Sequence, residues 1–422
     1  MKSTRELFFK YRHTFEGFIG KIVSRRLNRN DNSWRFLEIF LPNNGIFPKF
    51  QIIYMNKFNS NPMVVTKNIY QRFLEGGQNI PPETIINEQL IYPDNVILLG
   101  PKFYANGAYP SVAWWGFYEH MKSKNIKVTW LDIIENTNQT KFDILDKLNE
   151  IFSNPTENNI LFLDPLAAPE AFSEYRNLNQ KFFENIVTRS NFHIIGLLGD
   201  IWREKDRKQI INVENYFDGF IHTDKISASS YPEEIREKFF YYPFDAFDTG
   251  SFKPDLDKVN NFLFSGQIRD ADRRYWLRHL IDLSKKYDLK IENYSWYRYS
   301  HGKALEQAKF TEKLNKTQYS LSLTQKGKNN WVMTGRSKQS LLSGCTLIHQ
   351  ESPNYYMFEG ILTPYVDYLP FSNLYEFREV IKFVTDYPKE SKLIGLNGST
   401  KFRSIFPEVN FWNFCMRLNL SK

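Results

Sequence analysis

Each half of the chain shows the same pattern, in which short apolar runs alternate with stretches of helical periodicity. In the first half the apolar runs cover residues 95–99, 126–133, 159–163, 193–198 and 219–222. The helical stretches between them lie near residues 111–123, 141–152 and 168–188. Parallel strands need a long crossover, usually a helix, so this alternation predicts βαβ units and a parallel sheet.

A second series follows residues 241–258, which are rich in Pro, Gly and Asp and are typical of an interdomain linker. Its predicted strands are residues 261–265, 289–294, 319–323, 345–349 and 365–368, and its predicted helices are 273–287, 334–343 and 374–385. We therefore expect two α/β domains, at residues 91–248 and 249–400. Residues 1–90 are expected to form a partly helical N-terminal extension packed on the first domain, and residues 401–422 a C-terminal helical segment.

The bulk properties narrow the function classes. The formal net charge of +8 suits anionic ligands, an anionic membrane face or nucleic acid, and does not choose between them. With two cysteines, Cys345 and Cys415, neither a disulfide framework nor a cysteine zinc site is expected. The N-terminus lacks the apolar core of a signal peptide, and no window of 18 apolar residues exists, so we expect a cytoplasmic protein. Residues 7–26 fit a basic amphipathic helix, which could lie on the inner membrane face or pack on the protein's own body.

In an open parallel sheet, ligands bind beyond the carboxyl ends of the strands, so the loops there are the candidate sites. Gly266 directly follows a strand and would let a ligand approach the backbone, and Arg269 and Arg273 follow within about one turn. The arginine fork matches phosphate oxygens. The alternative is an ordinary strand–turn–helix connection with solvated arginines.

A second polar, basic loop begins at Thr324 and leads to a helix that opens at Gly335. Arg336 and Lys338 stand on the first turn of that helix, where the macrodipole disfavours positive charge. An anion such as a diphosphate at this point would explain them; a solvated first turn is the alternative.

The third loop follows residues 345–349 and contains Glu351 and Glu359. Either carboxylate could accept hydrogen bonds from sugar or ribose hydroxyls, and either could be an ordinary surface group.

The segment from Gly335 onward, GRSKQSLLSGCTLIHQESPNYYMFEGILTPYVDYLPFSNLYEFREVIKFV, resembles the donor-binding half of GT-B glycosyltransferases. The similarity is to group 1 transferases with a CgeB-like C-terminal part and to capsule-associated and exostosin-like families. It covers roughly residues 240–415. Gln339 stands where many group 1 enzymes place the first glutamate of an E-x7-E pair, and the second position would be Leu347, which is not acidic.

The resemblance implies an α/β fold with two Rossmann-like domains facing across a cleft, and transfer of a sugar from a nucleotide-sugar donor to a glycan or other hydroxyl acceptor. For such a reaction we expect no cofactor beyond the donor and no metal, and the basic residues are spread along the chain, so we expect no nucleic-acid partner. The donor-binding candidates are Gly266, Arg269, Arg273, Thr324, Gly335, Arg336, Lys338, Gln339, Glu351 and Glu359.

If the enzyme inverts the sugar, a general base should come from the first domain. Asp200, Asp164 and His222 each follow or end a predicted strand there and are the candidates for this catalytic role. Each could instead cap a helix or bond to the backbone.

Two rival interpretations remain open. A sugar-nucleotide epimerase or hydrolase of the same shape would bind the donor without depending on an acceptor. A non-catalytic glycan or nucleic-acid binding protein would use the +8 charge and the aromatic residues, which make up 17% of the chain.

Overall fold

A computed structural model describes the strands of both series and most of the second half of the chain. The described residues are 69–76, 92–100, 103–104, 109–110, 112–132, 150, 159–163, 165, 192–199, 204–223, 231–268, 271–296, 307–323, 334–351, 358 and 360–418. The chain divides into two compact units, each assembled from three segments. Unit 1 comprises Met1–Pro82, Phe252–Gln325 and Gln339–Phe402, and unit 2 comprises Glu83–Ser251, Lys326–Lys338 and Arg403–Lys422.

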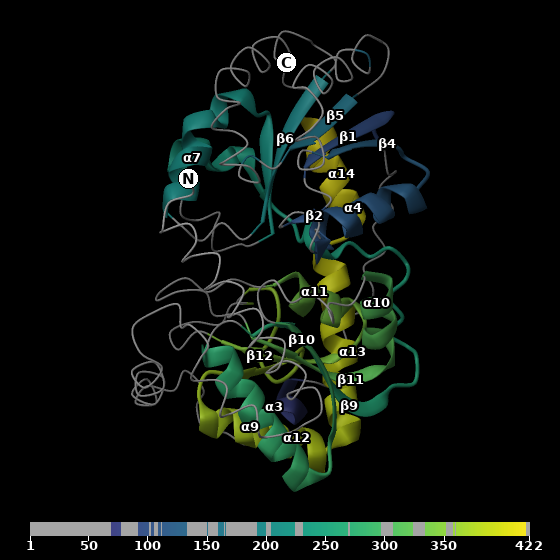
Figure 1. The fold of residues 1–422 in the computed structure, drawn as a ribbon, viewed down its shortest axis with the longest axis vertical. Coiled ribbons are helices and arrows are strands. Elements are labelled where there is room, and N and C mark those ends of the chain that lie inside the picture. The colour runs from purple at the N-terminus through teal and green to yellow at the C-terminus, as the bar shows by residue number, and fades with distance from the viewer. Residues whose placement is uncertain are drawn as a thin grey trace, which may run out of the picture. The chain divides into compact units, whose positions relative to one another are not determined.

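Unit 2 is built on a six-stranded parallel sheet (Figure 1). In sheet order the strands are β4 (Lys127–Asp132), β1 (Asn95–Gly100), β5 (Asn159–Leu163), β6 (Phe192–Leu198), β7 (Gly219–His222) and β8 (Phe239–Tyr241). Two further short strands, β2 (Phe103–Tyr104) and β3 (Tyr109–Pro110), pair with each other in antiparallel fashion. The central strands read as continuous apolar runs because both faces of the sheet are covered.

The helices of unit 2 cover both faces of its sheet. Among the described residues they are α4 (Val112–Ser123), α7 (Glu204–Val213) and α14 (Glu408–Arg417), with short 3₁₀ helices at Glu214–Tyr216, Glu233–Lys238 and Phe244–Ala246. Trp114 and Phe117 of α4 pack with Phe411 and Trp412 of α14 in one core, and Ile210 of α7 belongs to the other.

A half-buried carboxylate, that of Glu408, joins the start of α14 to α4. The Tyr92 hydroxyl donates a hydrogen bond to the Glu408 carboxylate at 2.8 Å. The carboxylate also lies 2.7 Å from Nζ of Lys124 and 3.2 Å from Nε2 of His120. Burial alone would raise the pKa of Glu408, but the hydrogen bonds and charges of His120 and Lys124, with Tyr92, lower it to about 2. The carboxylate therefore stays ionised and holds the helix in place.

Unit 1 is built on a five-stranded parallel sheet. In sheet order the strands are β10 (Lys290–Trp296), β9 (Val259–Gln267), β11 (Thr317–Ser322), β12 (Thr346–Gln350) and β13 (Leu369–Phe371). Its described helices are α3 (Ile69–Gly76), α9 (Ala271–Tyr287), α10 (Gln307–Lys316), α11 (Gly335–Leu342), α12 (Leu374–Asp386) and α13 (Pro388–Ile405). The last three residues of α13 and the first turn of α11 belong to unit 2.

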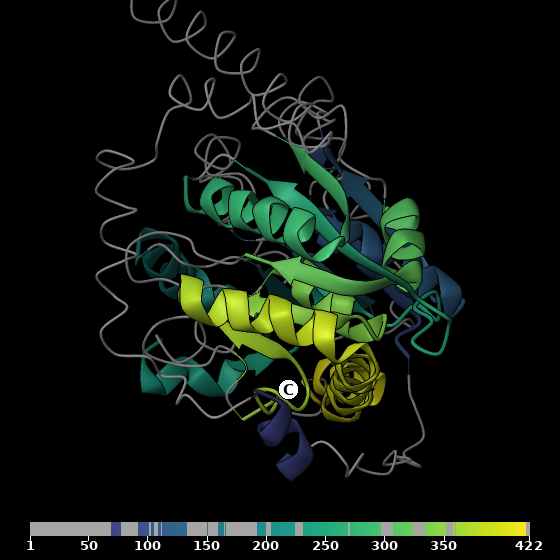
Figure 2. The same cartoon turned by 90° about the horizontal axis from the view of Figure 1, so that it is seen from below.

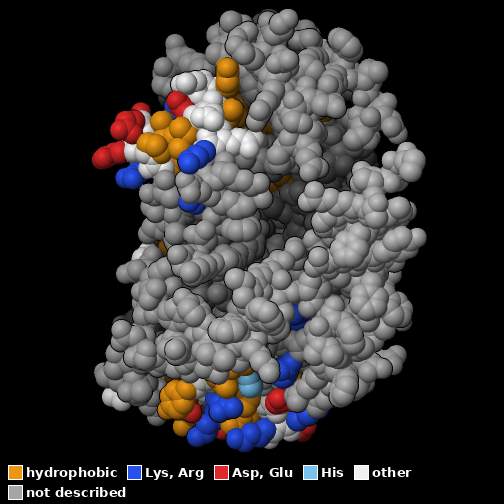
Figure 3. Space-filling view, turned by 60° about the vertical axis from the view of Figure 1, so that its left-hand side comes forward, with side chains coloured by type: hydrophobic (Ala, Val, Ile, Leu, Met, Phe, Trp, Pro, Cys, Tyr) orange, Lys and Arg blue, Asp and Glu red, His pale blue; other side chains and the backbone are white. Residues whose placement is uncertain are grey.

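Helices α9 and α12 contact each other against this sheet (Figure 2). Trp276 of α9 lies edge-on to Phe371 and Phe377, with ring centroids 5.0 and 5.4 Å away. Phe73 of α3 joins the same core. The N-terminal extension was expected to pack on the first domain, whereas its described helix α3 packs in unit 1. The outer surface of α9 and α12 carries exposed Lys, Arg and acidic side chains beside hydrophobic ones (Figure 3).

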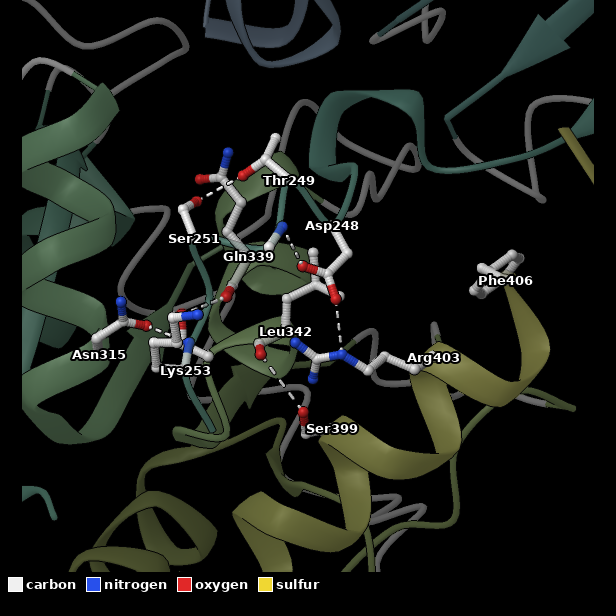
Figure 4. Close-up of polar contacts among 12 residues, drawn as sticks. Asp248, Thr249, Ser251, Lys253, Asn315, Gln339, Leu342, Ser399, Arg403 and Phe406 are labelled. Atoms are coloured by element: carbon white, nitrogen blue, oxygen red, sulfur yellow. Dashed lines mark hydrogen bonds and ion pairs between the residues drawn. The ribbon is translucent and has the colours of Figure 1, made fainter. Parts of the chain in front are cut away.

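Helix α13 packs unusually closely against the strand ends of unit 1. A Cβ atom on Gly395 would lie 2.7 Å from the Gly344 carbonyl oxygen, and one on Gly398 would lie 2.1 Å from that of Asp367. Beyond Phe402 the helix continues into unit 2, where Nε of Arg403 donates to Oδ2 of Asp248 at 2.9 Å (Figure 4). Because Gly395 and Gly398 have no Cβ atom, the backbone of α13 can contact the backbone of unit 1 at both positions.

Two parallel sheets with covering helices confirm the predicted α/β class. Residues 365–368 do not form a strand; Tyr365 has φ of 66°, Pro364 and Tyr368 form an isolated bridge, and the strand begins at Leu369. The domain boundaries and the cleft-facing arrangement stay predictions. The helices expected at residues 7–26, 141–152 and 168–188 lie outside the described residues. Within the described part of the chain, no helix is long and apolar enough to cross a membrane.

Candidate functional site

The strand order of unit 1 places a topological switch point between β9 and β11. From β9 the chain passes through α9 to β10 on one side, and then through α10 to β11 on the other side of β9. The connections that leave the carboxyl ends of β9 and β11 therefore run in opposite directions and open a crevice. Ligands of open α/β sheets bind at such a point, so the candidate site lies at this edge.

At the end of β9 the chain enters a helix after a short connection. Gly266 lies within the strand, and α9 begins at Ala271, so the predicted loop of residues 266–272 is shorter than expected. Arg274 is 1% exposed, and its Nη1 donates to the Ile268 carbonyl oxygen at 2.8 Å. This bond joins Ile268, the residue after β9, to the first turn of the helix. Arg273, the predicted phosphate-binding residue, is 9% exposed beside it.

Helix α11 separates the two predicted phosphate-binding cations. Residues two apart do not share a helix face. Arg336 is half-buried, whereas Lys338 is fully buried and its Nζ donates to the Thr223 carbonyl oxygen at 2.6 Å, with both residues in unit 2. The Thr223 carbonyl oxygen thus gives the Lys338 ammonium group a partner of opposite partial charge within the protein, where the sequence predicted an anionic ligand. Gly335 and Arg336 keep their predicted place on the first turn.

Buried hydroxyl groups fix α11 on the sheet. The Ser340 and Ser320 hydroxyl oxygens lie 2.7 Å apart and join the helix to β11. The Ser343 hydroxyl donates to the Gln339 carbonyl oxygen at 2.9 Å. Gln339 itself is 2% exposed, so the residue in the expected glutamate position is part of the packed helix.

A buried polar pair lies at the carboxyl end of β12. Oε1 of Glu351 lies 3.2 Å from Nδ1 of His349, and the two side chains are 2% and 0% exposed. Glu351 was predicted to accept hydroxyl groups; His349 was not singled out. A signal for His349 is present in the sequence, because residues two apart in a strand share a face.

The one described candidate for a general base lies in unit 2. His222 ends β7, is fully buried, and has the rings of Tyr231 and Phe239 beside it. Burial lowers the pKa of His222 to about 3, so the ring is uncharged near neutral pH. Within the described residues neither ring nitrogen has a hydrogen-bond partner. Its catalytic role stays a prediction.

The remaining predicted site residues lie outside the described part of the chain. They are Asp164, Asp200, Arg269, Thr324 and Glu359. No group of three or more His, Cys, Asp or Glu side chains that could hold a metal occurs among the residues that the structure describes.

The E-x7-E spacing fits a pair that sequence reasoning did not test. If Gln339 takes the first position, the second position falls on Leu347, which is fully buried in β12. Counting from Glu351 instead ends at Glu359, with seven residues between the two carboxylates. Applying the spacing to every glutamate of the segment would have found this pair.

Comparison by sequence found no relatives. No protein-family model matches the chain, and no curated protein matches it.

Comparison by structure found similar chains at low sequence identity. HepE from Anabaena in complex with UDP is 9% identical, with a TM-score of 0.48 over 78% of this chain and 99% of that one. An alpha-glucosyltransferase in complex with UDP-glucose and DNA containing an abasic site is 9% identical, with a TM-score of 0.49 over 78% and 99%. AviGT4, a glycosyltransferase involved in avilamycin A biosynthesis, is 9% identical, with a TM-score of 0.44 over 78% and 97%.

Proposed function

We propose that the protein is a glycosyltransferase that moves a sugar from a nucleotide-sugar donor to a hydroxyl acceptor. The observation that carries the proposal is the chemistry at the carboxyl edge of the unit 1 sheet. Arg273 stands on the first turn of α9, after one strand of the switch point, and the Glu351 carboxylate ends β12 at the same edge. A nucleotide sugar offers both complements, a diphosphate for the cation and hydroxyl groups for the carboxylate.

Arg336 is the further cation that we assign to the donor phosphates. It stands half-buried on the first turn of α11, the helix that follows β11, where backbone N–H groups also favour an anion. Charge on the departing diphosphate can be stabilised by such groups, so we propose a metal-independent reaction with no cofactor beyond the donor.

The acceptor side and the location of the protein are finer parts of the proposal. We propose a glycan or another hydroxyl compound as acceptor, with Asp200, Asp164 or His222 as the base if the reaction inverts. The Glu351–Glu359 spacing instead favours retention of the anomeric configuration, and NMR of the product distinguishes the two outcomes. We keep the cytoplasmic location and the membrane contact of residues 7–26 as part of the same proposal.

The test measures nucleotide binding to the wild type and to matched variants. UDP, GDP, CMP, dTDP and their common sugars are titrated by calorimetry, with UDP first because two of the similar structures contain UDP or UDP-glucose. A hydrogen bond to a charged group is worth about 1.5–3 kcal/mol, so Arg336→Ala should weaken binding roughly 10- to 150-fold. Arg336→Lys should restore part of it.

Lys285→Ala is the control, because Lys285 is exposed in the last turn of α9, at the end of the helix opposite Arg273 and the proposed site. It should leave binding unchanged. A wild type that binds no nucleotide, or that binds oligonucleotides in a salt-dependent way, would contradict the proposal. Donor hydrolysis without acceptor dependence would favour a hydrolase, and activity lost with EDTA would contradict the metal-independent scheme.

A further inference from the structure

His349 and Glu351 are placed by strand backbone and not by a flexible loop. His349 pairs with Ser322 of β11 on one side and with Pro370 of β13 on the other. The Glu351 N–H donates to the Phe371 carbonyl oxygen at 2.8 Å, which extends the ladder one residue beyond β12. The backbone of both residues is therefore held in place, and the burial of both side chains restricts the rotamers that they can adopt.

The surroundings of the imidazole ring leave the carboxylate as its polar partner. Phe358 lies edge-on to the ring with centroids 4.9 Å apart, and Tyr368 lies at 6.3 Å. Nε2 of His349 has no hydrogen-bond partner among the described residues, while Nδ1 lies 3.2 Å from Oε1 of Glu351. An imidazole nitrogen can donate to a carboxylate only when it carries a proton, so the proton belongs on Nδ1.

A carboxylate that is 2% exposed needs such a donor. Without one, the buried charge is costly and the group turns or neutralises. The hydrogen bond from Nδ1 holds one carboxylate oxygen and so contributes to the orientation of the carboxylate plane. The orientation of that plane decides which hydroxyl groups the carboxylate can accept at the sheet edge.

We infer that His349 is a positioning residue of the donor site, whose Nδ1–H aims the Glu351 carboxylate at a hydroxyl group of the donor sugar. The inference rests on the proposed function and adds a residue to it. His349 acts through Glu351 and touches neither the nucleotide nor the diphosphate. Its loss should therefore affect recognition of the sugar and leave recognition of the nucleotide intact.

Two amide substitutions separate this role from simple space filling. The side-chain nitrogen of Asn superposes on the Nδ1 position of histidine, and that of Gln superposes on the Nε2 position. His349→Asn keeps a donor toward Glu351, whereas His349→Gln moves the donor away from it. Glu351→Gln removes the negative charge of the carboxylate that the ring orients. It serves as the reference for complete loss of the carboxylate's role.

The probes are the nucleotide sugar that the wild type binds most tightly, among UDP-, GDP-, CMP- and dTDP-linked sugars, and its parent nucleotide. A misaimed catalytic or binding group costs about 10- to 100-fold. We expect His349→Gln and Glu351→Gln to lower kcat/KM for the nucleotide sugar by about that factor. Both should bind the parent nucleotide within about twofold of the wild type, a difference of roughly 0.4 kcal/mol. His349→Asn should keep most of the activity.

A spectroscopic measurement tests the geometry without any variant. In wild-type protein with ¹⁵N-labelled histidine, NMR should show a hydrogen-bonded proton on Nδ1 of His349. A ring whose Nδ1 carries no proton overturns the inference, whether or not the variants fold.

The outcomes separate the two proposals. If the wild type transfers the sugar and His349→Gln matches His349→Asn, the positioning role falls and the proposed function stands. If His349→Gln weakens the parent nucleotide as much as the nucleotide sugar, the role is structural and the inference again falls. If the wild type binds no nucleotide or nucleotide sugar, the proposed function falls and takes the inference with it.

Discussion

Lys338 and Thr223 lie 115 positions apart in the chain, and a 2.6 Å hydrogen bond joins the ammonium nitrogen of the first to the carbonyl oxygen of the second. Both residues are buried. The bond ties the first half of α11 to the residue that follows β7. A lysine that the sequence placed among the phosphate ligands thus has a structural contact.

Substitution of Lys338 by methionine should destabilise the fold. Methionine keeps the apolar stem and removes the ammonium group, so the buried Thr223 carbonyl loses this partner at a cost of about 1–3 kcal/mol. Urea unfolding of the two proteins measures the difference. A variant with unchanged stability but weakened nucleotide binding would show that the ammonium serves the ligand instead.

Alanine at Gly398 should disrupt the packing of α13. The added Cβ would lie 2.1 Å from the Asp367 carbonyl oxygen, which belongs to the backbone and cannot rotate away. We expect the free energy of unfolding to fall by about 1–3 kcal/mol or more. Gly116→Ala is the control: it lies in α4 with no atom within 4 Å of the new Cβ, and it should gain about 0.5–1 kcal/mol from helix propensity. Thermal unfolding of both variants checks the contrast, and an equal effect at the two sites would refute it.

Glu408→Gln should remove a stabilisation that depends on pH. The folded-state pKa of Glu408 is about 2, below its ordinary value of 4.5. A depressed pKa means that the stabilisation is complete above about pH 4.5 and is lost as the pH falls toward 2. With the side chain 19% exposed, we expect the variant to lose about 2 kcal/mol at pH 7. The difference from the wild type should shrink in acid; a difference independent of pH would contradict the ion pairs with His120 and Lys124.

His222→Phe should make the protein less sensitive to mild acid. Burial lowers the pKa of His222 from 6.5 to about 3, so the unfolded chain binds a proton in this range that the folded chain does not. Stability contributed by the uncharged ring is therefore present above about pH 6.5 and falls as the pH drops below it. Between pH 6 and 4 the slope of the unfolding free energy should decrease by up to about 1.4 kcal/mol per pH unit in the variant. Identical slopes would show that His222 titrates normally.

Strands were predictable from sequence where a short apolar run had clear ends. β5 and β7 match their predicted residues because both are buried runs followed by polar residues. β13 (Leu369–Phe371) was missed because the predicted strand covered residues 365–368, and Pro370 is a residue that local preference disfavours in a strand. Proline is tolerated there because β13 is the edge of its sheet, where one side of the backbone has no neighbour to bond.

Helix α13 could not be predicted from local preference. Gly395 and Gly398 weaken a helix in isolation, and their reason for being there is the backbone of Gly344 and Asp367. The candidate site shows the same limit. Spacing predicted that Arg336 and Lys338 begin a helix, but the carbonyl of Thr223 that receives the lysine comes from a distant segment.

The packing of α14 also bears on the order in which the protein folds during synthesis. Phe411, Trp412 and Cys415 complete a core whose last strand is β8, which ends at Tyr241. A ribosome that adds about 5–20 residues per second needs roughly 10–35 s to synthesise the chain from Tyr241 to Phe411. For that time the earlier strands wait with an apolar face uncovered, a state that favours chaperone capture or aggregation. The core of unit 2, whose strands are synthesised before those of unit 1, is therefore completed only when the last helix of the described chain is made.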